Sequence, residues 1–593
     1  MKDCKILVKC VKLSDYVFDF LCKKNVNVVF HLPGGGCMHL LNSLGANKDI
    51  NAVSMLHEQA VAVACEAYAN TTGTPGVALV TTGPGGTNAV TGVLAAHLDS
   101  VPCFFISGQV KTTDLKSNFG VRSHGSQEAD IVSIVSDITK YAIMVRDKET
   151  IRYHLERAWH EMTSGRCGPV WIDIPLDVQG AQIVPEALEG FTPETRKPAD
   201  INIQAIISAI NKAKRPVIIA GNGLAKCKKN FYSLADFLQF PIIPTWKAMD
   251  YISGCNPLYA GRAGGMGDRS GNLTMQNADL IISLGSRLDF SITGFERTEW
   301  AVCAQKIIID IDKNEILKLK GVVKIIPIIA DTSDFIDELL SRKAELSLSD
   351  ISVWKSKINE WKAKYPIEPL GDKLTTYHFV NELCKQLPEG AYVAPCSAGT
   401  TAEIFFQAFR VKPNQVIRSN HGLGSMGFEL PNAVGMCIAS GMSDVICIAG
   451  DGGVQMNIQE LAVIRGRNLP IKLFVINNRG YASIRNMQNN HFEGYHIGCD
   501  DESGLFLPDI NAIAAAYEIP YFKADCIAGL ESVVKSALQT CGPVICEIKV
   551  DVECFLTLRT ATKIMPDGSL KSSPLENQFP FLSDEEMKGN MLI

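Results

Sequence analysis

A carboxylate between glycines and a later pair of asparagines are the side chains of this sequence best suited to hold a metal ion and a phosphate. Gly450-Asp451-Gly452 precedes a helix-like stretch, and an apolar run further on ends at Asn477-Asn478. Carboxylate and amide oxygens suit Mg²⁺, which takes its other ligands from phosphates. Glycines at a helix start let backbone N–H groups approach phosphate. The motif predicts a magnesium diphosphate site, and the alternative is a turn followed by a polar strand end.

The elements around this motif must bring its two ends together. The order turn, helix, turn, buried strand places Asp451 and Asn478 at the carboxyl ends of neighbouring parallel strands, where α/β sheets bind ligands. Short apolar runs alternate with amphipathic stretches along the rest of the chain, which is typical of parallel sheets covered by helices. The fold class we predict is therefore α/β, with three doubly wound parallel-sheet domains.

The division of the chain follows from the strand candidates and from composition. We expect one domain over 1–182, a second over 183–345, a helical connector over 346–374, a third domain over 375–555, and a tail or lid over 556–593. Residues 180–200 are rich in proline and charge and are interpreted as a linker. Expected strands are Val26–Phe30, Val77–Thr81, Cys103–Ser107, Val170–Ile174, Val217–Ala220, Leu280–Leu284, Lys306–Ile311, Lys324–Ile329, Tyr392–Ala394, Val445–Ala449, Ile471–Ile476 and Val544–Val550.

Bulk composition excludes several classes of protein. The 593 residues are 46% hydrophobic and carry a net charge of −6, with no basic stripe that would suit nucleic acid. No apolar run is long enough to cross a bilayer, and the N-terminus lacks a signal-peptide pattern. Nineteen cysteines are scattered without metal spacing, many in apolar runs as Cys103 and Cys447 are. Free thiols in a reducing cytoplasm are the natural interpretation.

Motifs along most of the chain resemble one enzyme family. They occur in family order between about residues 10 and 550, and they are Leu32–Gly36, His57–Gln59, Thr82–Asn88, Asp99–Pro102, Ser107–Gln109, Gln127-Glu128, Gly168–Val170, Asp173–Pro175, Leu423–Gly427 and Ile448–Glu460. The chain thereby resembles acetolactate synthase, of the thiamine diphosphate (ThDP) superfamily. The resemblance implies a pyrimidine-binding N-terminal domain, a central Rossmann-like domain and a diphosphate-binding C-terminal domain.

The resemblance assigns catalytic roles to residues of the first domain. Glu58 would activate the aminopyrimidine ring of ThDP, and Gln127 with the loop around Gly35 would face the reacting carbon. Glu58 also opens an Ala-rich helix, where a carboxylate is favoured electrostatically, so plain helix capping is the alternative.

In the third domain, Gly424 would accept a hydrogen bond from the 4′-amino group, and Met426 would hold the bend of the cofactor. Ordinary core packing is the alternative for Met426.

The same resemblance places the metal and diphosphate. Mg²⁺ would be held by Asp451, Asn478 and the carbonyl of Gly480. The remaining cofactor contacts are assigned to Gly450, Gly452, Gly453, Gly399, Thr400, Thr401 and Ile484. Where the family has Gly-Gln-His-Gln, this chain has Gly399-Thr-Thr-Ala402, so the contact of the family histidine is in question. Glu429 is an unusual charge near the cofactor, either a substrate contact or a structural ion pair.

Oligomeric state and a second cofactor also follow from the resemblance. Because Glu58 and Asp451 belong to different subunits in this family, the active unit is expected to be a homodimer or homotetramer. The family's central domain binds FAD without a redox role, and the matching positions are Arg166, Gly221, Gly223, Thr245, Gly285, Asp310 and Asp331. Many Rossmann-like domains keep such glycine turns while binding nothing. The family histidine of the flavin segment is replaced by Met266, so FAD is left open.

Departures from the family cluster in its acceptor pocket. A Phe is replaced by Ser126, a Met by Gly265, and the Trp that gates the substrate channel by Met487. Smaller and more polar groups indicate an acceptor bulkier and more polar than pyruvate, and the alternative is drift repacked elsewhere. Arg287 keeps the family's substrate-side guanidinium, which can pair with an anionic group.

The function predicted from the sequence is a ThDP- and Mg²⁺-dependent carboligase. It would decarboxylate a 2-oxo acid donor, such as pyruvate, and transfer the two-carbon unit to a carbonyl acceptor larger or more polar than pyruvate, for which a keto-sugar is one candidate. Acetolactate synthase of branched-chain amino acid synthesis is the alternative, and simple decarboxylation or acetyl transfer to phosphate ranks after it. From another class, a non-catalytic cofactor-binding or regulatory protein stays open, since fold does not determine function. No nucleic-acid or membrane partner is expected.

Overall fold

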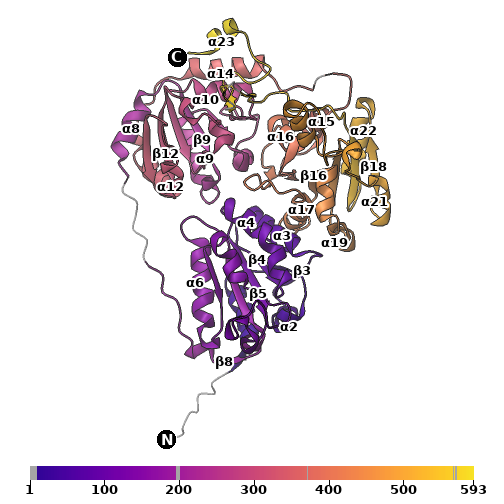
Figure 1. The fold of residues 1–593 in the computed structure, drawn as a ribbon. Helices are drawn as coiled ribbons and strands as arrows, with labels where there is room; N and C mark the ends of the chain where they lie inside the picture. Colours follow the sequence, from indigo (N-terminus) through magenta and orange to yellow (C-terminus); the bar gives the residue numbers. More distant parts are fainter. Residues whose placement is uncertain (1–9, 195–200, 370, 565–566, 568–569, 593) are drawn as a thin grey trace.

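The computed structural model describes residues 10–194, 201–369, 371–564, 567 and 570–592. It is an α/β protein with three parallel sheets of six, five and six strands, as the apolar periodicity predicts. The predicted linker 180–200 lies outside the described residues over 195–200. Figure 1 shows three bodies, with the N-terminal domain below, the central domain at upper left and the third domain at right.

The N-terminal domain is built on a six-stranded sheet. Its strands, in spatial order, are β3 (Asn51–Ser54), β2 (Val28–His31), β4 (Gly76–Val80), β5 (Cys103–Gln109), β7 (Val170–Pro175) and β6 (Tyr141–Met144), all parallel. The helices are α1 (Leu13–Lys23), α2 (Met38–Ala46), α3 (Glu58–Thr72), α4 (Pro84–Leu98), α5 (Ile131–Val135), α6 (Ile151–Thr163) and α7 (Leu176–Gln179). A short antiparallel pair, β1 (Val11–Lys12) and β8 (Gln182–Ile183), joins the two ends of the domain.

The third domain repeats the strand order of the first. Its parallel sheet runs β15 (Val416–Ile417), β14 (Tyr392–Ala394), β16 (Val445–Gly450), β17 (Ile471–Asn477), β19 (Val544–Lys549) and β18 (Tyr521–Ala524). Its helices are α15 (Thr376–Gln386), α16 (Gly399–Ala408), α17 (Glu429–Ala439), α18 (Asp451–Val454), α19 (Glu460–Gly466), α20 (Ala482–His491), α21 (Ile510–Ala516) and α22 (Ile527–Gln539). β16 and β17 are neighbours, which confirms the predicted placement of their carboxyl ends.

The central domain has a five-stranded parallel sheet. The strands are β10 (Ile242–Pro244), β9 (Pro216–Ala220), β11 (Leu280–Leu284), β12 (Gln305–Asp310) and β13 (Ile325–Ile329). The helices are α8 (Ile203–Lys212), α9 (Lys228–Leu238), α10 (Arg269–Gln276), α11 (Phe290–Thr293), α12 (Lys313–Leu317) and α13 (Thr332–Ser341). Its core is rich in isoleucine and leucine from both faces of the sheet, as expected for buried parallel strands.

The connector and the chain end pack together on the central domain. Helix α14 (Ser352–Lys364) buries Trp354 and Trp361 edge to face, 5.8 Å apart. The C-terminal segment carries the antiparallel pair β20 (Thr562–Ile564) and β21 (Leu570–Ser572) and helix α23 (Asp584–Asn590). The Nε1 atom of Trp361 donates to Asn590 Oδ1 over 3.0 Å, and α23 lies above α14 and α10 in Figure 1. The chain end is therefore docked on the central domain.

Helices α3 and α17 join the first and third domains (Figure 1). The sequence of α3 is rich in alanine, so its surface is shallow, and its end is set by Gly73 at φ 73°. A Cβ on Gly435 of α17 would lie 2.3 Å from the carbonyl oxygen of Ala64. Small residues on both helices thus allow close backbone contact, which positions the N-terminus of α3 relative to the third domain.

Two expectations from composition can be checked in the fold. Every cysteine of the described residues is free, and Cys103 and Cys447 are buried. None of the helices described is both long and apolar enough to span a bilayer.

Candidate functional site

The predicted metal motif lies at the carboxyl ends of β16 and β17. Asp451 is buried, and its carboxylate accepts hydrogen bonds from the amides of Gly452 (2.8 Å) and Gly480 (3.0 Å). Burial raises the pKa of Asp451 to about 6, against the lowering effect of these amides. The Oδ1 atom of Asn478 is buried with no hydrogen-bond partner in the described residues. A buried carboxylate beside an unpartnered amide oxygen fits a hard cation, because both groups can serve as its oxygen ligands and the amide oxygen thereby gains a partner.

Glycine turns line the same end of the sheet. Gly399 begins α16 at φ 77°, and Gly424 has φ 67°, backbone that glycine adopts without strain. Thr400 and Thr401 follow in the first turn of α16 and are buried, so their amides are among the free N–H groups of a helix start. A Cβ on Gly452 would lie 2.3 Å from the ring of Tyr481. These turns fit a diphosphate held by backbone amides. A Cβ on Gly450 would have no atom within 4 Å, and one on Gly453 would lie 3.8 Å from the carboxylate oxygens of Glu429.

The first-domain half of the site is a cluster of loops around the start of α3. Glu58 is 7% exposed, and its Oε2 accepts a hydrogen bond of 3.0 Å from Asn88 Nδ2. Gly34 and Gly36 pack on Thr81, whose Oγ1 accepts from the Gly36 amide at 3.1 Å. Gly35, between them, has open space around its Cα.

Gln127 is held in an uncommon backbone conformation. Its φ is 59°, in the left-handed region that few residues other than glycine adopt. A Cβ on Gly83, itself at φ 63°, would lie 2.1 Å from the carbonyl oxygen of Gln127. The loop is therefore pressed against the first turn of α4, and strain of this kind is frequent at ligand sites.

The two halves meet through the backbone before α3. The amide of Leu56 donates to Glu460 Oε1 over 3.1 Å, and Glu460 lies nine residues after Asp451. The hydrogen bonds that the structure gives to Glu58 and to Asp451 stay within their own domains. In a single chain the structure thus joins the two domains without linking Glu58 to the metal motif among the described residues.

Among the described residues, no hydrogen bond or ion pair joins the predicted acceptor residues of the single chain to one another. Ser126 is exposed beside Gln127, while Met487 on α20 is 39% exposed, and Ile484 of the same helix, predicted as a cofactor contact, is 40% exposed. Gly265 is buried under the C-terminal segment, where the amide of Thr560 donates to its carbonyl oxygen at 3.0 Å. A Cβ at Gly265 would lie 3.2 Å from Thr560 Oγ1, so a larger side chain there would press on the C-terminal segment. The role of Gly265 in an acceptor pocket stays a prediction.

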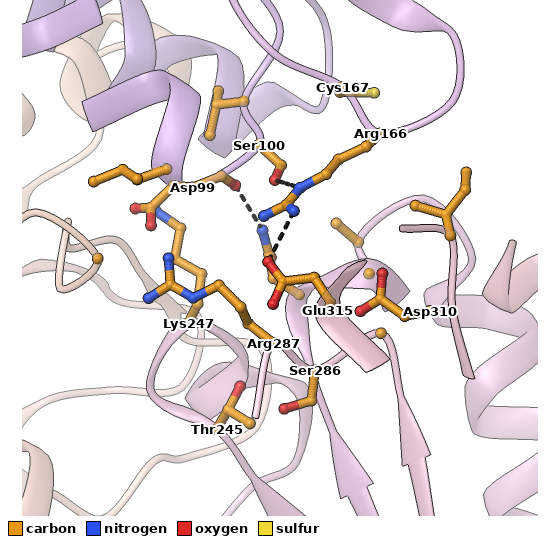
Figure 2. Close-up of a pocket in the computed structure, with 18 of the residues that line it drawn as sticks. Asp99, Ser100, Arg166, Cys167, Thr245, Lys247, Ser286, Arg287, Asp310 and Glu315 are labelled. Carbon is orange, nitrogen blue, oxygen red and sulfur yellow. Dashed lines mark hydrogen bonds and ion pairs between the residues drawn. The ribbon is translucent and has the colours of Figure 1, made fainter. Parts of the chain in front are cut away.

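A cavity of about 320 Å³ lies where all three domains meet (Figure 2). It is lined by six of the seven residues predicted for a flavin, namely Arg166, Gly223, Thr245, Gly285, Asp310 and Asp331. Arg287 lies on its wall and pairs with Asp289 over 2.7 Å. Six residues of the predicted flavin set thus line one cavity together.

Several residues that line the cavity form ion pairs or hydrogen bonds with other residues of the chain. Arg166 pairs with Asp312 (3.1 Å) and Glu315 (2.9 Å), the latter visible in Figure 2. Asp331 accepts from the Ser333 amide at the start of α13. Burial raises the pKa of Asp310 to about 6, with Glu315 nearby adding to the effect. The guanidinium of Arg166 therefore ties the first domain to the central one.

Packing between two turns also explains why Gly221, Gly223 and Gly285 are glycines. Cβ atoms on Gly221 and Gly223 would lie 2.2 Å and 2.6 Å from backbone atoms of Gly285. The turns after β9 and β11 thus need glycine to pack on each other, whether or not a ligand approaches them.

Two groups of residues escaped the sequence reasoning. Trp246 stacks between Phe406 and His421, with ring centroids 3.6 Å apart on each side. Lys247 binds Asp99 at 2.6 Å on the wall of the cavity. Both follow β10, so their place after a parallel strand is the signal that could have found them.

Three family models match the chain in the expected order. They are the N-terminal TPP binding domain of thiamine pyrophosphate enzymes over residues 11–134, the central domain over 203–339 and the C-terminal TPP binding domain over 397–548. Thiamine pyrophosphate is another name for ThDP. Each match falls on one of the three sheets described above.

Relatives of known function align over most of the chain. The acetolactate synthase large subunit of Cyanidium caldarium is 31% identical over 560 residues, covering 91% of this chain and 93% of the relative. The acetolactate synthase isozyme 1 large subunit of Escherichia coli K12 is 30% identical over 546 residues, with 91% and 94% covered. The chloroplastic acetolactate synthase of Arabidopsis thaliana is 30% identical over 550 residues, with 91% and 81% covered. With its three matching domains, the chain belongs to the ThDP-dependent enzymes as a distant homologue of the acetolactate synthase large subunits.

Proposed function

We propose that this enzyme is a ThDP- and Mg²⁺-dependent carboligase whose acceptor is larger or more polar than pyruvate. A 2-oxo acid such as pyruvate serves as donor. The observation that carries the proposal is the contrast between an intact cofactor set, Glu58, Asp451 and Asn478, and an altered acceptor side. Ser126 places a hydroxyl beside Gln127 where the family has a phenyl ring, and Met487 replaces a rigid indole by a flexible chain. A keto-sugar is one acceptor that these changes would suit.

Each residue of the proposed site has a role that follows from its position. Bound ThDP would supply a nucleophilic carbon and an electron sink for the charge left by loss of CO₂. Glu58, buried and held by Asn88, exchanges a proton with the aminopyrimidine ring. Asp451 and Asn478 hold Mg²⁺ on the diphosphate. Gln127 and the loop at Gly35 lie next to the donor carbon, and Ser126 contacts the acceptor.

Acetolactate formation is the second candidate, and one observation favours it. Arg287 retains the guanidinium expected on the substrate side, and it lies in the cavity near the loop of Gly422, where a Cβ would be 3.7 Å from Arg287 Nη1. The relatives described above are named acetolactate synthases. Under this candidate a second pyruvate is the acceptor, and its carboxylate pairs with Arg287.

The acceptor is tested with a panel of carbonyl compounds. The enzyme is incubated with ThDP, Mg²⁺, pyruvate and one acceptor at a time, and products heavier by one acetaldehyde unit are sought by mass spectrometry. We expect a polar acceptor to outcompete pyruvate in the wild type, and Ser126→Phe to shift the preference toward pyruvate. An unchanged acceptor preference in Ser126→Phe contradicts the assignment of this pocket.

The active unit we propose is a homodimer, or a homotetramer of such dimers, in which Glu58 of one copy faces Asp451 of the other. In support, apolar side chains around both half-sites are exposed in the single chain: Met38, Leu56, Phe119, Met456, Ile484, Met487, Phe492, Tyr495 and Phe506. Large apolar side chains exposed in a single chain are common where a second copy packs. A second copy would bury it and complete the site.

Mixing two inactive variants tests this arrangement. Glu58→Ala and Asp451→Ala, each inactive alone, are co-expressed so that mixed dimers form. If sites form between copies, half of the dimers hold one intact site, and about a quarter of the wild-type activity per subunit returns. No recovery in isolated mixed dimers would mean that each site lies within one chain.

The cavity between the domains is proposed to bind FAD. Convergence of the six predicted residues supports this, while the pairing of Arg166 with two carboxylates leaves that guanidinium less free for a diphosphate. The visible absorption spectrum of the purified protein, before and after incubation with FAD and gel filtration, tests the proposal. A flavin band that stays with the protein is expected, and its absence after both treatments contradicts FAD binding.

A further inference from the structure

Glu429 is a buried carboxylate beneath the glycine turns of the third domain. It is the first residue of α17 and is 3% exposed. Its Oε1 accepts a weak hydrogen bond of 3.4 Å from the amide of Ser397. Its Oε2 is buried with no hydrogen-bond partner in the described residues. One carboxylate oxygen of Glu429 therefore has a backbone partner, and the other is available to a ligand.

The position of the free oxygen is given by the turn after β16. A Cβ on Gly453 would lie 3.8 Å from both carboxylate oxygens of Glu429. Gly453 follows Asp451 and Gly452 in the turn assigned to the diphosphate, and Ser397 lies two residues before Gly399, where α16 begins. Glu429 thus lies between the two backbone segments that would cradle the diphosphate.

The surroundings of Glu429 favour its neutral form. Burial raises its pKa to about 7, against the backbone amides of Ser397, Gly427 and Glu429 itself, which lower it. The titratable groups facing it are the thiols of Cys396 and Cys447, whose own pKa values are raised well above the usual range by burial. Within the described part of the chain, no cation contributes to the pKa of this carboxyl. A magnesium diphosphate would bring a cation, which favours the ionised carboxylate, and anionic oxygens, which favour the protonated carboxyl where it contacts them directly.

We propose that Glu429 is a cofactor-contacting residue that binds as a neutral carboxyl and donates a hydrogen bond from Oε2 to a diphosphate oxygen of ThDP. The proton stays on Oε2 and no bond to a heavy atom changes. This contact would take the place of the donor lost where the family histidine is replaced in Gly399-Thr-Thr-Ala402. The proposal rests on the diphosphate site argued above.

The test measures ThDP affinity rather than turnover. Dissociation constants for ThDP at saturating Mg²⁺ are determined by calorimetry for the wild type, Glu429→Gln and Glu429→Leu, at about pH 6 and about pH 8. The amide of Glu429→Gln donates at both pH values, whereas the wild-type carboxyl loses its proton as the pH rises. We expect the affinity ratio of Glu429→Gln to wild type to increase about tenfold between the two pH values, and Glu429→Leu to bind more weakly than either at about pH 6.

A matched replacement controls for the titration of ThDP itself. Glu403 is a half-buried glutamate on α16 whose pKa is also raised by burial, and Glu403→Gln should follow the wild-type pH profile. Equal profiles for Glu429→Gln, Glu403→Gln and the wild type would overturn the proposal. Failure of the wild type to bind ThDP at all would instead overturn the proposed function.

Inorganic diphosphate locates the contact. The dissociation constant of inorganic diphosphate is measured by its competition with ThDP in the presence of Mg²⁺. Glu429→Gln should change this constant with pH in the same way as it changes the dissociation constant of ThDP. If the substitution changes the affinity for ThDP but not for inorganic diphosphate, the carboxyl contacts another part of the cofactor and the proposal is wrong.

Discussion

Asp451 and Gly480 are linked by a hydrogen bond of 3.0 Å from the Gly480 amide to Asp451 Oδ2. The bond joins the loops that follow β16 and β17, so the two ends of the metal motif are aligned by the chain itself. Asn478 is left between them, and its Oδ1 has no partner in the described residues. Preorganised ligands lose little freedom when an ion binds, which favours tight binding.

The adjacent asparagines allow a direct test of the metal assignment. Asn478→Ala removes the unpartnered oxygen, and we expect the Mg²⁺ concentration for half-maximal activity to rise about tenfold or more. Asn477 is the matched control, because its side chain binds Glu547 at 2.6 Å within the sheet. Asn477→Ala should lower the melting temperature while leaving the Mg²⁺ dependence near that of the wild type. Equal Mg²⁺ dependence in both variants would remove Asn478 from the metal site.

Glu58 is expected to act in proton transfer. Glu58→Gln keeps the shape and the contact with Asn88 but cannot ionise, so turnover should fall by roughly 10²–10⁴-fold. Binding of ThDP and Mg²⁺, measured by calorimetry, should persist, because the diphosphate contacts lie in the other domain. Turnover like that of the wild type would contradict the catalytic assignment.

The loop of Gln127 depends on Gly83. An alanine at Gly83 would place its Cβ 2.1 Å from the Gln127 carbonyl oxygen, so the loop must move. We expect Gly83→Ala to lower kcat by about tenfold or more, since small displacements of positioned groups are costly. A Cβ on Gly45 in α2 would have no atom within 4 Å, and Gly45→Ala should leave kcat unchanged. Equal kcat values for the two variants would mean that Gln127 is not positioned by this contact.

Stability should depend on Asp173, a buried acid outside the cofactor set. Its carboxylate accepts from Ser107 Oγ (2.6 Å) and Gln109 Nε2 (3.0 Å), yet burial raises its pKa to about 7. The folded protein holds this proton more tightly than the unfolded chain does, whose pKa lies near 3.8. Between these values, stability contributed by Asp173 falls as pH rises, by at most about 1.4 kcal/mol per pH unit.

Asp173→Asn carries no such titration. Its melting temperature, measured by differential scanning fluorimetry from about pH 4 to about pH 7, should therefore rise relative to that of the wild type as the pH increases. A difference in melting temperature that is the same at every pH would show that Asp173 does not titrate in this range.

The parts of the site that sequence patterns predict are those fixed by local chain order. Asp451 and Asn478 each follow a recognisable strand, and parallel neighbours end at one sheet edge, so their proximity follows from periodicity. The start of α3 at Glu58 follows from an alanine-rich run. These features need no knowledge of how distant segments pack.

Features that depend on distant segments escaped prediction. Thr560, near the far end of the chain, covers Gly265, and Arg166 meets Glu315 across a domain boundary. Sequence periodicity cannot predict these contacts between distant residues, because they form only when complete domains pack together. Reasoning from residue volume at Gly265 therefore could not include the contact with Thr560. Ser126 and Met487 are exposed in the single chain, where a second copy can cover them.

Pyruvate alone gives the most direct test of the proposed function. The purified enzyme is given ThDP, Mg²⁺ and pyruvate, and both CO₂ release and acetolactate are followed. We predict little acetolactate, with rapid pyruvate consumption only once a larger carbonyl compound is added. Rapid acetolactate formation from pyruvate alone would contradict the proposed function, because pyruvate would then be its own acceptor.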